Sequence, residues 1–192
     1  VPARAPAAEA RPDEQPLAAE PMLPVAPADA PAVPLPPFSA IAEIERIYRD
    51  SDASRAVSVA LDNPRVRIGV DRLNFRVRSS SPGYLYVFMV GTNAHFYKLF
   101  PNAIDADNRL RANTWLDLPR SGWRMTAGGP AGTNHFVAVV SEHPRDFGAS
   151  GLVEVAPFAE FPLDQATQIA TRATGRHSAF IGTPICPSLA TP

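Results

Sequence analysis

Cysteine and lysine are almost absent from this sequence of 192 residues, which contains one of each, Cys186 and Lys98. A single cysteine excludes both a disulfide within the chain and a zinc site built from several cysteines. The formal net charge is −1, so the chain also lacks the excess of basic residues typical of nucleic-acid-binding proteins. The longest apolar run, residues 84–90, has the length of a strand and is too short to cross a bilayer. We therefore expect no nucleic-acid partner and no membrane span in this chain.

Sequence motifs of common enzyme classes are missing as well. There is no G-x-S-x-G of a serine hydrolase, no G-x-x-x-x-G-K for nucleotide phosphates and no H-R-D of a protein kinase. No two histidines have the i, i+4 spacing of a metal-binding helix; they are His95, His135, His143 and His177. The sequence therefore predicts no catalytic residue, no metal ligand and no cofactor. We expect a protein that is not an enzyme, with any catalytic domain upstream of this chain.

Side chains with oxygen atoms raise the alternative of a calcium site at Asp105, Asp107 and Asn108. An EF-hand also requires a glutamate further along the loop, and none occurs at the proper distance. The other interpretation is a turn whose side chains accept hydrogen bonds from their own backbone.

Proline is concentrated at the start of the chain, where residues 1–38 hold 11 of the 22 prolines and 11 alanines. Proline removes backbone donors and alanine offers little surface to bury, so residues 1–37 are predicted to be an extended Pro/Ala-rich linker. The alternative is a recognition strip that uses the apolar residues Met22, Leu23, Val25, Val33 and Leu35.

A short amphipathic helix is predicted for residues 40–50, with Ser39 as its N-cap. Its apolar stripe consists of Ile41, Ile44, Ile47 and Tyr48, while Glu43 and the other charged residues are expected elsewhere. We expect this stripe to dock on the chain's own sheet; the alternative is an exposed helix for a partner.

Apolar and polar residues alternate with a period of two from Ala56 onward, which is typical of half-buried strands. Residues 84–90 and 134–141 are instead apolar on both faces, as expected of central strands covered on either side. The expected strands are residues 57–61, 65–71, 73–78, 84–90, 95–100, 115–118, 134–141 and 152–155.

A second helix is predicted from Leu163 to Ala173, closed by Gly175. Short strands joined by glycine and proline turns, with little helix between them, indicate a mainly β protein. The sequence therefore predicts an antiparallel β-sandwich over residues 38–192, with a short N-terminal helix and a C-terminal helix.

Arginines make up the most concentrated charge. Arg65, Arg67, Arg76 and Arg78 alternate outward on two expected strands, with Arg72 between them, and could form a cationic ribbon. Together with the nearby Tyr84 and Tyr86, such a ribbon could bind the carboxylates of a cell-wall glycan or peptide. The alternative is a solvated face without a ligand.

Apolar residues outside the expected sandwich are the candidates for docking a protein partner. They are Phe38, Ile41 and Tyr48 near the first helix, and Leu23, Val25 and Leu35 in the linker.

Residues from about Arg65 to Arg145 resemble the bacterial family called domain of unknown function 4384. Its series of signatures is found here as Leu73-Asn74-Phe75-Arg76-Val77-Arg78-Ser79, Gly83-Tyr84-Leu85-Tyr86-Val87, Leu99-Phe100-Pro101-Asn102, Asp107-Asn108, Leu118-Pro119, and Pro130-x-Gly132 ahead of Val137 to Ser141. The linker, the first helix and the C-terminal helix lie outside the resemblance.

The resemblance implies an accessory domain without an assigned activity. Such domains are attached, often through Pro/Ala-rich linkers, to bacterial serine/threonine kinases and to envelope proteins or proteins of type VI secretion. We accordingly expect a non-catalytic interaction or sensor module, displayed in the periplasm as part of a longer exported or membrane-anchored protein. Its expected partner is an envelope or secretion-system protein; the alternative is a cell-wall component.

Overall fold

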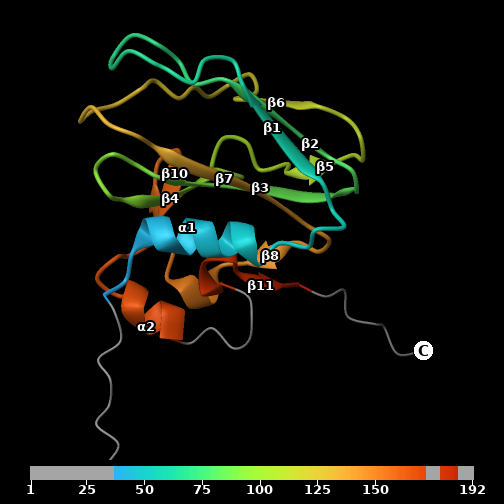
Figure 1. The fold of residues 1–192 in the computed structure, drawn as a ribbon, viewed down its shortest axis with the longest axis vertical. Coiled ribbons are helices and arrows are strands. Elements are labelled where there is room, and N and C mark those ends of the chain that lie inside the picture. The colour runs from blue at the N-terminus through green and yellow to red at the C-terminus, as the bar shows by residue number, and fades with distance from the viewer. Residues whose placement is uncertain (1–36, 172–177, 186–192) are drawn as a thin grey trace, which may run out of the picture. The chain divides into compact units, whose positions relative to one another are not determined.

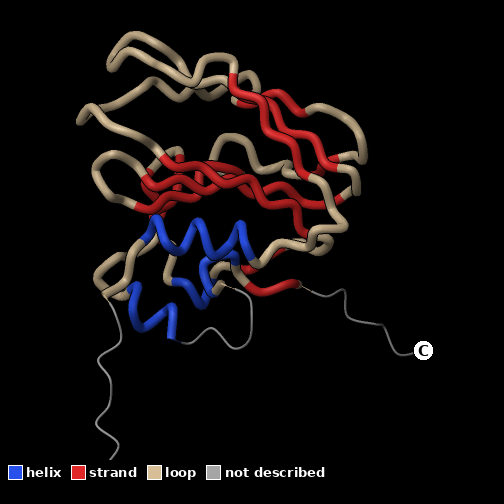
Figure 2. The backbone as a smooth tube through the Cα atoms, viewed as in Figure 1, coloured by secondary structure: helices blue, strands red, loops and turns tan. Residues whose placement is uncertain are grey.

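Three layers of secondary structure are stacked in the computed structural model, which describes residues 37–171 and 178–185 (Figure 1). Figure 2 shows that two layers consist of strands and that the helices lie together on one side. The helices are α1 (Ala40–Arg49) and α2 (Ala166–Thr171), with 3-10 turns η1 (Gly148–Ser150) and η2 (Ala179–Ile181). The strands are β1 (Val57–Leu61), β2 (Phe75–Ser79), β3 (Gly83–Val90), β4 (Phe96–Phe100), β5 (Arg109–Leu110), β6 (Leu116–Leu118), β7 (His135–Ser141), β8 (Arg145–Asp146), β9 (Val153–Val155), β10 (Phe158–Glu160) and β11 (Thr183–Pro184).

Strand β3 organises the larger sheet. It pairs antiparallel with β7 along its whole length, and with β4 and β5 on the other side. Strand β10 then pairs with β4, and β9 closes the sheet beyond β10. The prediction of a central strand at residues 84–90 is confirmed, because this strand has partners on both edges.

The three-stranded sheet β1-β2-β6 covers one face of the larger sheet. Phe75 and Val77 of β2 face inward and pack with Leu85 and Val87 of β3. Between the two sheets, this sandwich core also contains Leu99, Phe100, Leu118, Trp123 and Met125. Since all named pairs of strands are antiparallel, the prediction of a mainly β, antiparallel sandwich is confirmed.

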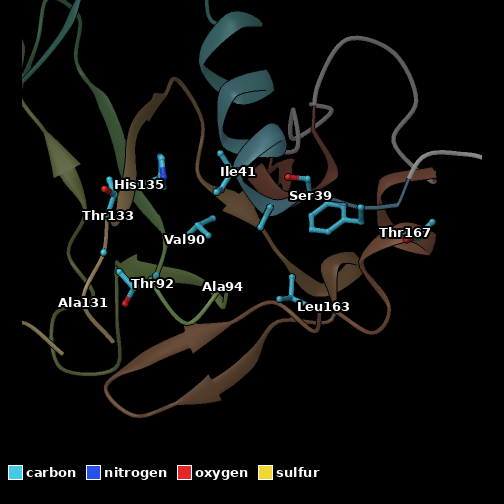
Figure 3. A pocket seen from close by; sticks show the side chains of 14 residues that line it. Ser39, Ile41, Val90, Thr92, Ala94, Ala131, Thr133, His135, Leu163 and Thr167 are labelled. Carbon is cyan, nitrogen blue, oxygen red and sulfur yellow. The ribbon is translucent and has the colours of Figure 1, made fainter. Parts of the chain in front are cut away.

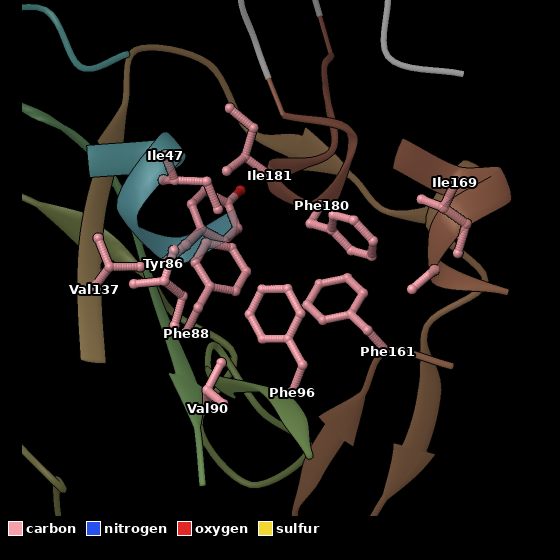
Figure 4. Packing of buried hydrophobic residues seen from close by; sticks show 12 residues of the cluster. Ile47, Tyr86, Phe88, Val90, Phe96, Val137, Phe161, Ile169, Phe180 and Ile181 are labelled. Atoms are coloured by element: carbon pink, nitrogen blue, oxygen red, sulfur yellow. The ribbon is translucent and has the colours of Figure 1, made fainter. Parts of the chain in front are cut away.

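A layer of helices and turns covers the opposite face of the larger sheet. Phe88 and Phe96 point into this layer and pack against two further rings (Figure 4). Phe161 directly follows β10, and Phe180 belongs to η2. Aromatic rings at such distances pack favourably edge to face or tilted. Phe161 and Phe180 lie outside the strands and helices that the sequence predicts, yet they supply two of these four rings.

Helix α1 begins where the sequence predicts it, because the Ser39 side chain accepts a hydrogen bond from Ala42 N–H at 3.3 Å. Ile44 and Ile47 are buried, which confirms docking on the chain's own sheet. The predicted apolar stripe is wrong at two positions: Tyr48, expected to be buried, is 75% exposed, and Glu43, expected on the exposed face, is buried. Neither α1 nor α2, the helices of the described residues, has the length and hydropathy that a membrane span needs.

The strand expected at residues 65–71 is a loop instead. The Asp71 carboxylate accepts a hydrogen bond from Arg67 N–H at 2.7 Å, and Gly69 has a φ of 74°, so local polar contacts close a turn here. Ile68 and Val70, which alternation would place inside, are therefore exposed.

Truncation of Phe88 tests the aromatic core beneath the helices. Phe88 is fully buried and lies 6.1 Å from both Phe147 and Phe161, measured between ring centroids. Phe88→Ala should lower the free energy of unfolding by about 3–5 kcal/mol in denaturant titrations. The exposed control Val70→Ala should change it by less than about 0.5 kcal/mol. Equal, small effects would show that this layer does not contribute to stability.

Candidate interaction surface

The outer face of the three-stranded sheet carries two of the arginines that the sequence singles out. Buried and exposed residues alternate along β2, so Arg76 and Arg78 point away from the core that Val77 enters. In the register with β6, Arg76 lies opposite Asp117. The two arginines therefore stand side by side on one exposed face.

Trp115, just before β6, joins these arginines. The Cζ atoms of Arg76 and Arg78 each lie 4.8 Å from the centroid of its ring, within the range of cation–π contacts. We call these three residues the Arg–Trp cluster. Trp115 is not among the residues predicted for the site, although the alternation of the sequence places it on the outer face, out of phase with the inward-facing Leu116 and Leu118.

Although Asp117 lies opposite Arg76 in the register, neither guanidinium group of the Arg–Trp cluster forms an ion pair within the described part of the chain. No carboxylate oxygen there lies within 4.0 Å of either group. Arg76 and Arg78 are exposed, and Trp115 is half-buried. Their N–H donors are consequently accessible to carboxylates from outside.

The other arginines of the expected ribbon do not join the cluster. Arg67 forms a two-pronged ion pair with Asp71, with a distance of 2.9 Å from Nη2 to Oδ1. Hydrogen bonding to Arg67 keeps the pKa of Asp71 below its ordinary value. Arg65 lies in the preceding turn, where its N–H donates to Asn63. The predicted cationic ribbon is therefore wrong at Arg65 and Arg67, because the strand expected at residues 65–71 is a loop.

Tyr84 and Tyr86 lie on β3, in the other sheet. Tyr86 is buried, and its hydroxyl accepts a hydrogen bond from Arg145 N–H at 2.7 Å. Tyr84 is half-buried and lines a polar groove of about 1030 Å³ together with Arg109 and Arg111. The structure therefore does not bring either tyrosine to the Arg–Trp cluster.

Two partly buried cations have structural partners. Lys98 Nζ donates to the Pro101 carbonyl at 2.7 Å, and Arg145 donates to Ser141 Oγ and to the Gly182 carbonyl. Burial lowers the pKa of both groups. Because backbone carbonyls satisfy their donors, these cations hold the fold together and differ from Arg76 and Arg78.

The residues proposed for docking a partner differ in their exposure to solvent. Phe38 is half-buried and lies 5.2 Å from Phe180 between ring centroids, so it packs against the core. Ile41 and Tyr48 are exposed. Leu23, Val25 and Leu35 lie outside the described residues.

A second groove, of about 580 Å³, lies beside the start of α1 (Figure 3). Ile41 and Leu163 line it together with the hydroxyl groups of Thr92 and Thr133, and His135 stands at one side. Its described lining contains no carboxylate, lysine or arginine. Its described lining therefore offers no carboxylate to pair with His135, as a hydrolytic site would require.

Asp105, one of the acidic residues considered for calcium, is used within the fold. Its carboxylate accepts hydrogen bonds from Arg120 and from Trp123 Nε1, the latter at 3.0 Å. Desolvation by burial opposes ionisation, but the hydrogen bonds from Arg120 and Trp123 keep the pKa of Asp105 below its ordinary value. Within the described ranges, no three His, Cys, Asp or Glu side chains are grouped so as to hold a metal ion.

A D-F-G triplet at residues 146–148 matches that of protein kinases in letters only. Asp146 Oδ1 accepts a hydrogen bond from Gly148 N–H at 2.9 Å, which makes a local turn. Phe147 packs on Tyr86 and Phe88 in the core. The residues of this D-F-G triplet therefore have structural roles.

The family model described as "Domain of unknown function (DUF4384)" matches residues 65–144. These residues belong to that family. The match contains β2 to β7 and the Arg–Trp cluster, and leaves out α1, β1 and everything from β8 onward. Comparisons with curated proteins and with solved structures gave no match.

Signature residues of the DUF4384 segment have structural roles. An added Cβ at Gly83 would lie 2.5 Å from the Ser141 carbonyl oxygen, so only glycine allows β3 and β7 to approach here. Asn102 accepts from two backbone N–H groups, and the Asn108 side chain donates to the Leu85 carbonyl at 3.0 Å. Within the segment, the exposed Arg–Trp cluster is therefore the better candidate for function.

Asp105→Asn tests the Arg120 ion pair. An amide would leave the donors poorly matched, so the free energy of unfolding at pH 7 should fall by about 1–3 kcal/mol. A lowered folded-state pKa stabilises the fold above the unfolded pKa of about 3.9, and this stabilisation is lost as the pH falls through the folded value. The difference between the wild type and Asp105→Asn should thus shrink toward pH 2, whereas the exposed control Asp62→Asn should show little effect. A difference independent of pH would contradict this role.

Proposed function

We propose that this chain is a non-catalytic interaction module that binds acidic segments of a partner protein through the Arg–Trp cluster. The observation that carries the proposal is the pair of exposed guanidinium groups, Arg76 and Arg78, that contact Trp115 and no carboxylate of the described residues. Arginine binds carboxylates with two parallel hydrogen bonds, a geometry that a planar guanidinium fits well.

The spacing of the two arginines indicates the form of the ligand. Residues two apart on a strand, such as Arg76 and Arg78, are separated by about 6.7 Å. An extended peptide with acidic residues at alternate positions has the same repeat on one face. The cluster therefore fits an extended acidic segment better than a single isolated carboxylate.

Trp115 contributes by restricting the arginines. A guanidinium that lies over an aromatic ring keeps its N–H edge free while losing side-chain freedom. Less conformational entropy is then lost when a carboxylate binds. This preorganisation supports a role in binding rather than a merely solvated face.

The proposal extends to the setting of the module. We propose that it works in the periplasm, as part of an envelope or secretion-associated protein in which a Pro/Ala-rich linker (residues 1–37) precedes the sandwich. The resemblance to accessory domains and the near absence of cysteine support this setting. Cell fractionation of the full-length parent protein tests it, and recovery of the module from the cytoplasm would contradict it.

A charge-reversal experiment tests the binding role. A peptide of alternating glutamate and serine should bind the wild type and shift the indole N–H resonance of Trp115. The double variant Arg76→Glu, Arg78→Glu should lose more than about tenfold in affinity because both carboxylate contacts become repulsive. A peptide with glutamine in place of glutamate should not bind.

The matched control reverses two other exposed arginines, Arg109→Glu and Arg111→Glu, which line the polar groove. This variant has the same net charge as the first, so it should bind within about twofold of the wild type if the site and not the overall charge decides affinity. Equal losses in both double variants would contradict the proposal. Pull-down by purified peptidoglycan but not by the acidic peptide would assign the cluster to cell-wall carboxylates instead.

A further inference from the structure

Strand β1 forms a free edge of the three-stranded sheet and lacks the usual protection. Its sequence, VSVAL, contains neither charge nor proline, and its register with β2 runs without a bulge from Val57 to Leu61. Soluble proteins normally protect such edges with lysine, proline or a bulge, because unpaired backbone groups attract other strands. An edge of this kind is suited to strand pairing.

The backbone groups at this edge can be assigned from the hydrogen bonds to β2. Asp62 N–H donates to the Asn74 carbonyl at 3.1 Å, and Ser80 N–H donates to the Ala56 carbonyl at 2.9 Å. In an antiparallel ladder the hydrogen-bonded positions alternate, so even-numbered residues of β1 bond to β2. Val57, Val59 and Leu61 therefore direct their N–H and C=O groups to the free edge.

The side chains of these same residues form an incompletely covered apolar strip. They lie opposite Ser79, Val77 and Phe75, which places them on the inner face of the sheet. Nevertheless Val57, Val59 and Leu61 are 36%, 50% and 44% exposed. The free edge of β1 thus offers both unpaired backbone groups for hydrogen bonds and exposed apolar side chains for packing.

We propose that two copies of this chain associate by antiparallel pairing of β1 with β1 about Val59. In this register Val57 faces Leu61 of the partner subunit, and Val59 faces Val59 of the partner subunit. All facing positions then have outward-directed backbone groups, and each facing pair exchanges two hydrogen bonds. The exposed side chains meet on one face, where β-branched cross-strand pairs are favourable.

Charge complementarity favours a second copy as the occupant. The strand has no charge, while Arg55 precedes it and Asp62 follows it. In this register Arg55 faces Asn63 of the partner subunit, one position from Asp62 of the partner subunit, so residues of opposite sign meet at both ends of the contact. In the isolated chain Arg55 lies 3.1 Å from Glu142, so it already interacts at this end of the sheet.

One edge strand of the other sheet, β9, provides a contrast. Its three residues are Val153, Glu154 and Val155. Full overlap of two copies of β9 would place Glu154 opposite Glu154 of the partner subunit, and like charges at facing positions are destabilising. The sequence of β1 is therefore more compatible with self-pairing than that of β9.

Pairing at β1 would also place the two Arg–Trp clusters on the same outer face of a continuous sheet. This consequence alone rests on the proposed function: an acidic partner with two segments would bind with increased avidity. Dimerisation itself requires only the edge and does not depend on what the cluster binds.

Sedimentation equilibrium of the full chain tests the proposal. With increasing concentration, the wild type should approach twice the chain mass of 20.6 kDa. Val59→Lys should remain monomeric, because two lysines would face each other at the symmetry axis. Val155→Lys makes the same change at the exposed edge strand β9 and should dimerise like the wild type.

A second measurement separates disrupted pairing from disrupted folding. Because Val59 is half exposed, Val59→Lys should keep the circular dichroism spectrum and melting temperature of dilute wild type. In a Cys186→Ser background, Val59→Cys should form a disulfide-linked dimer under mild oxidation, since facing Cα atoms about 5.5 Å apart allow this bond. Val155→Cys should not. A wild type that stays monomeric up to about 1 mM, or a Val59→Lys variant that still dimerises, would overturn the proposal.

Discussion

Strand β3 is apolar on both faces, so it can be buried only between two other layers. Leu85 and Val87 meet the three-stranded sheet, whereas Phe88 and Val90 meet the helices and the segments after β10. The larger sheet is thereby covered from both sides, and its main role is to position the outer layers. Signature residues such as Gly83 serve this role by allowing β7 to approach β3.

The three-stranded sheet has only one face in the core. Its outer face and its β1 edge therefore remain open, and both carry features that burial does not explain: the Arg–Trp cluster and the exposed apolar strip of β1. Cations elsewhere, such as Lys98, satisfy backbone carbonyls. Both proposed interaction surfaces thus lie on the sheet that contributes only one face to the core.

Period-two alternation predicted most strands because inward residues such as Phe75 and Val77 repeat at this spacing. It failed at residues 65–71, where the Asp71 carboxylate and Gly69 favour a turn although Ile68 and Val70 continue the pattern. Arg76 and Arg78 were correctly placed on an exposed face. Their contact with Trp115 joins segments far apart in the sequence, and the contribution of Phe161 and Phe180 to the core is equally nonlocal. Such contacts depend on topology and register, which local periodicity does not specify.

The dependence on two covering layers is tested most directly by isolating the DUF4384 segment. A fragment of residues 65–144 keeps β2 to β7 but lacks α1, β1, Phe161 and Phe180, so the helix-side face of β3 would be exposed. Amide hydrogen exchange and thermal unfolding should be compared with those of residues 37–192. We expect no cooperative transition and rapid exchange of the β3 amides in the fragment. A fragment that unfolds cooperatively with native-like protection of β3 would contradict it.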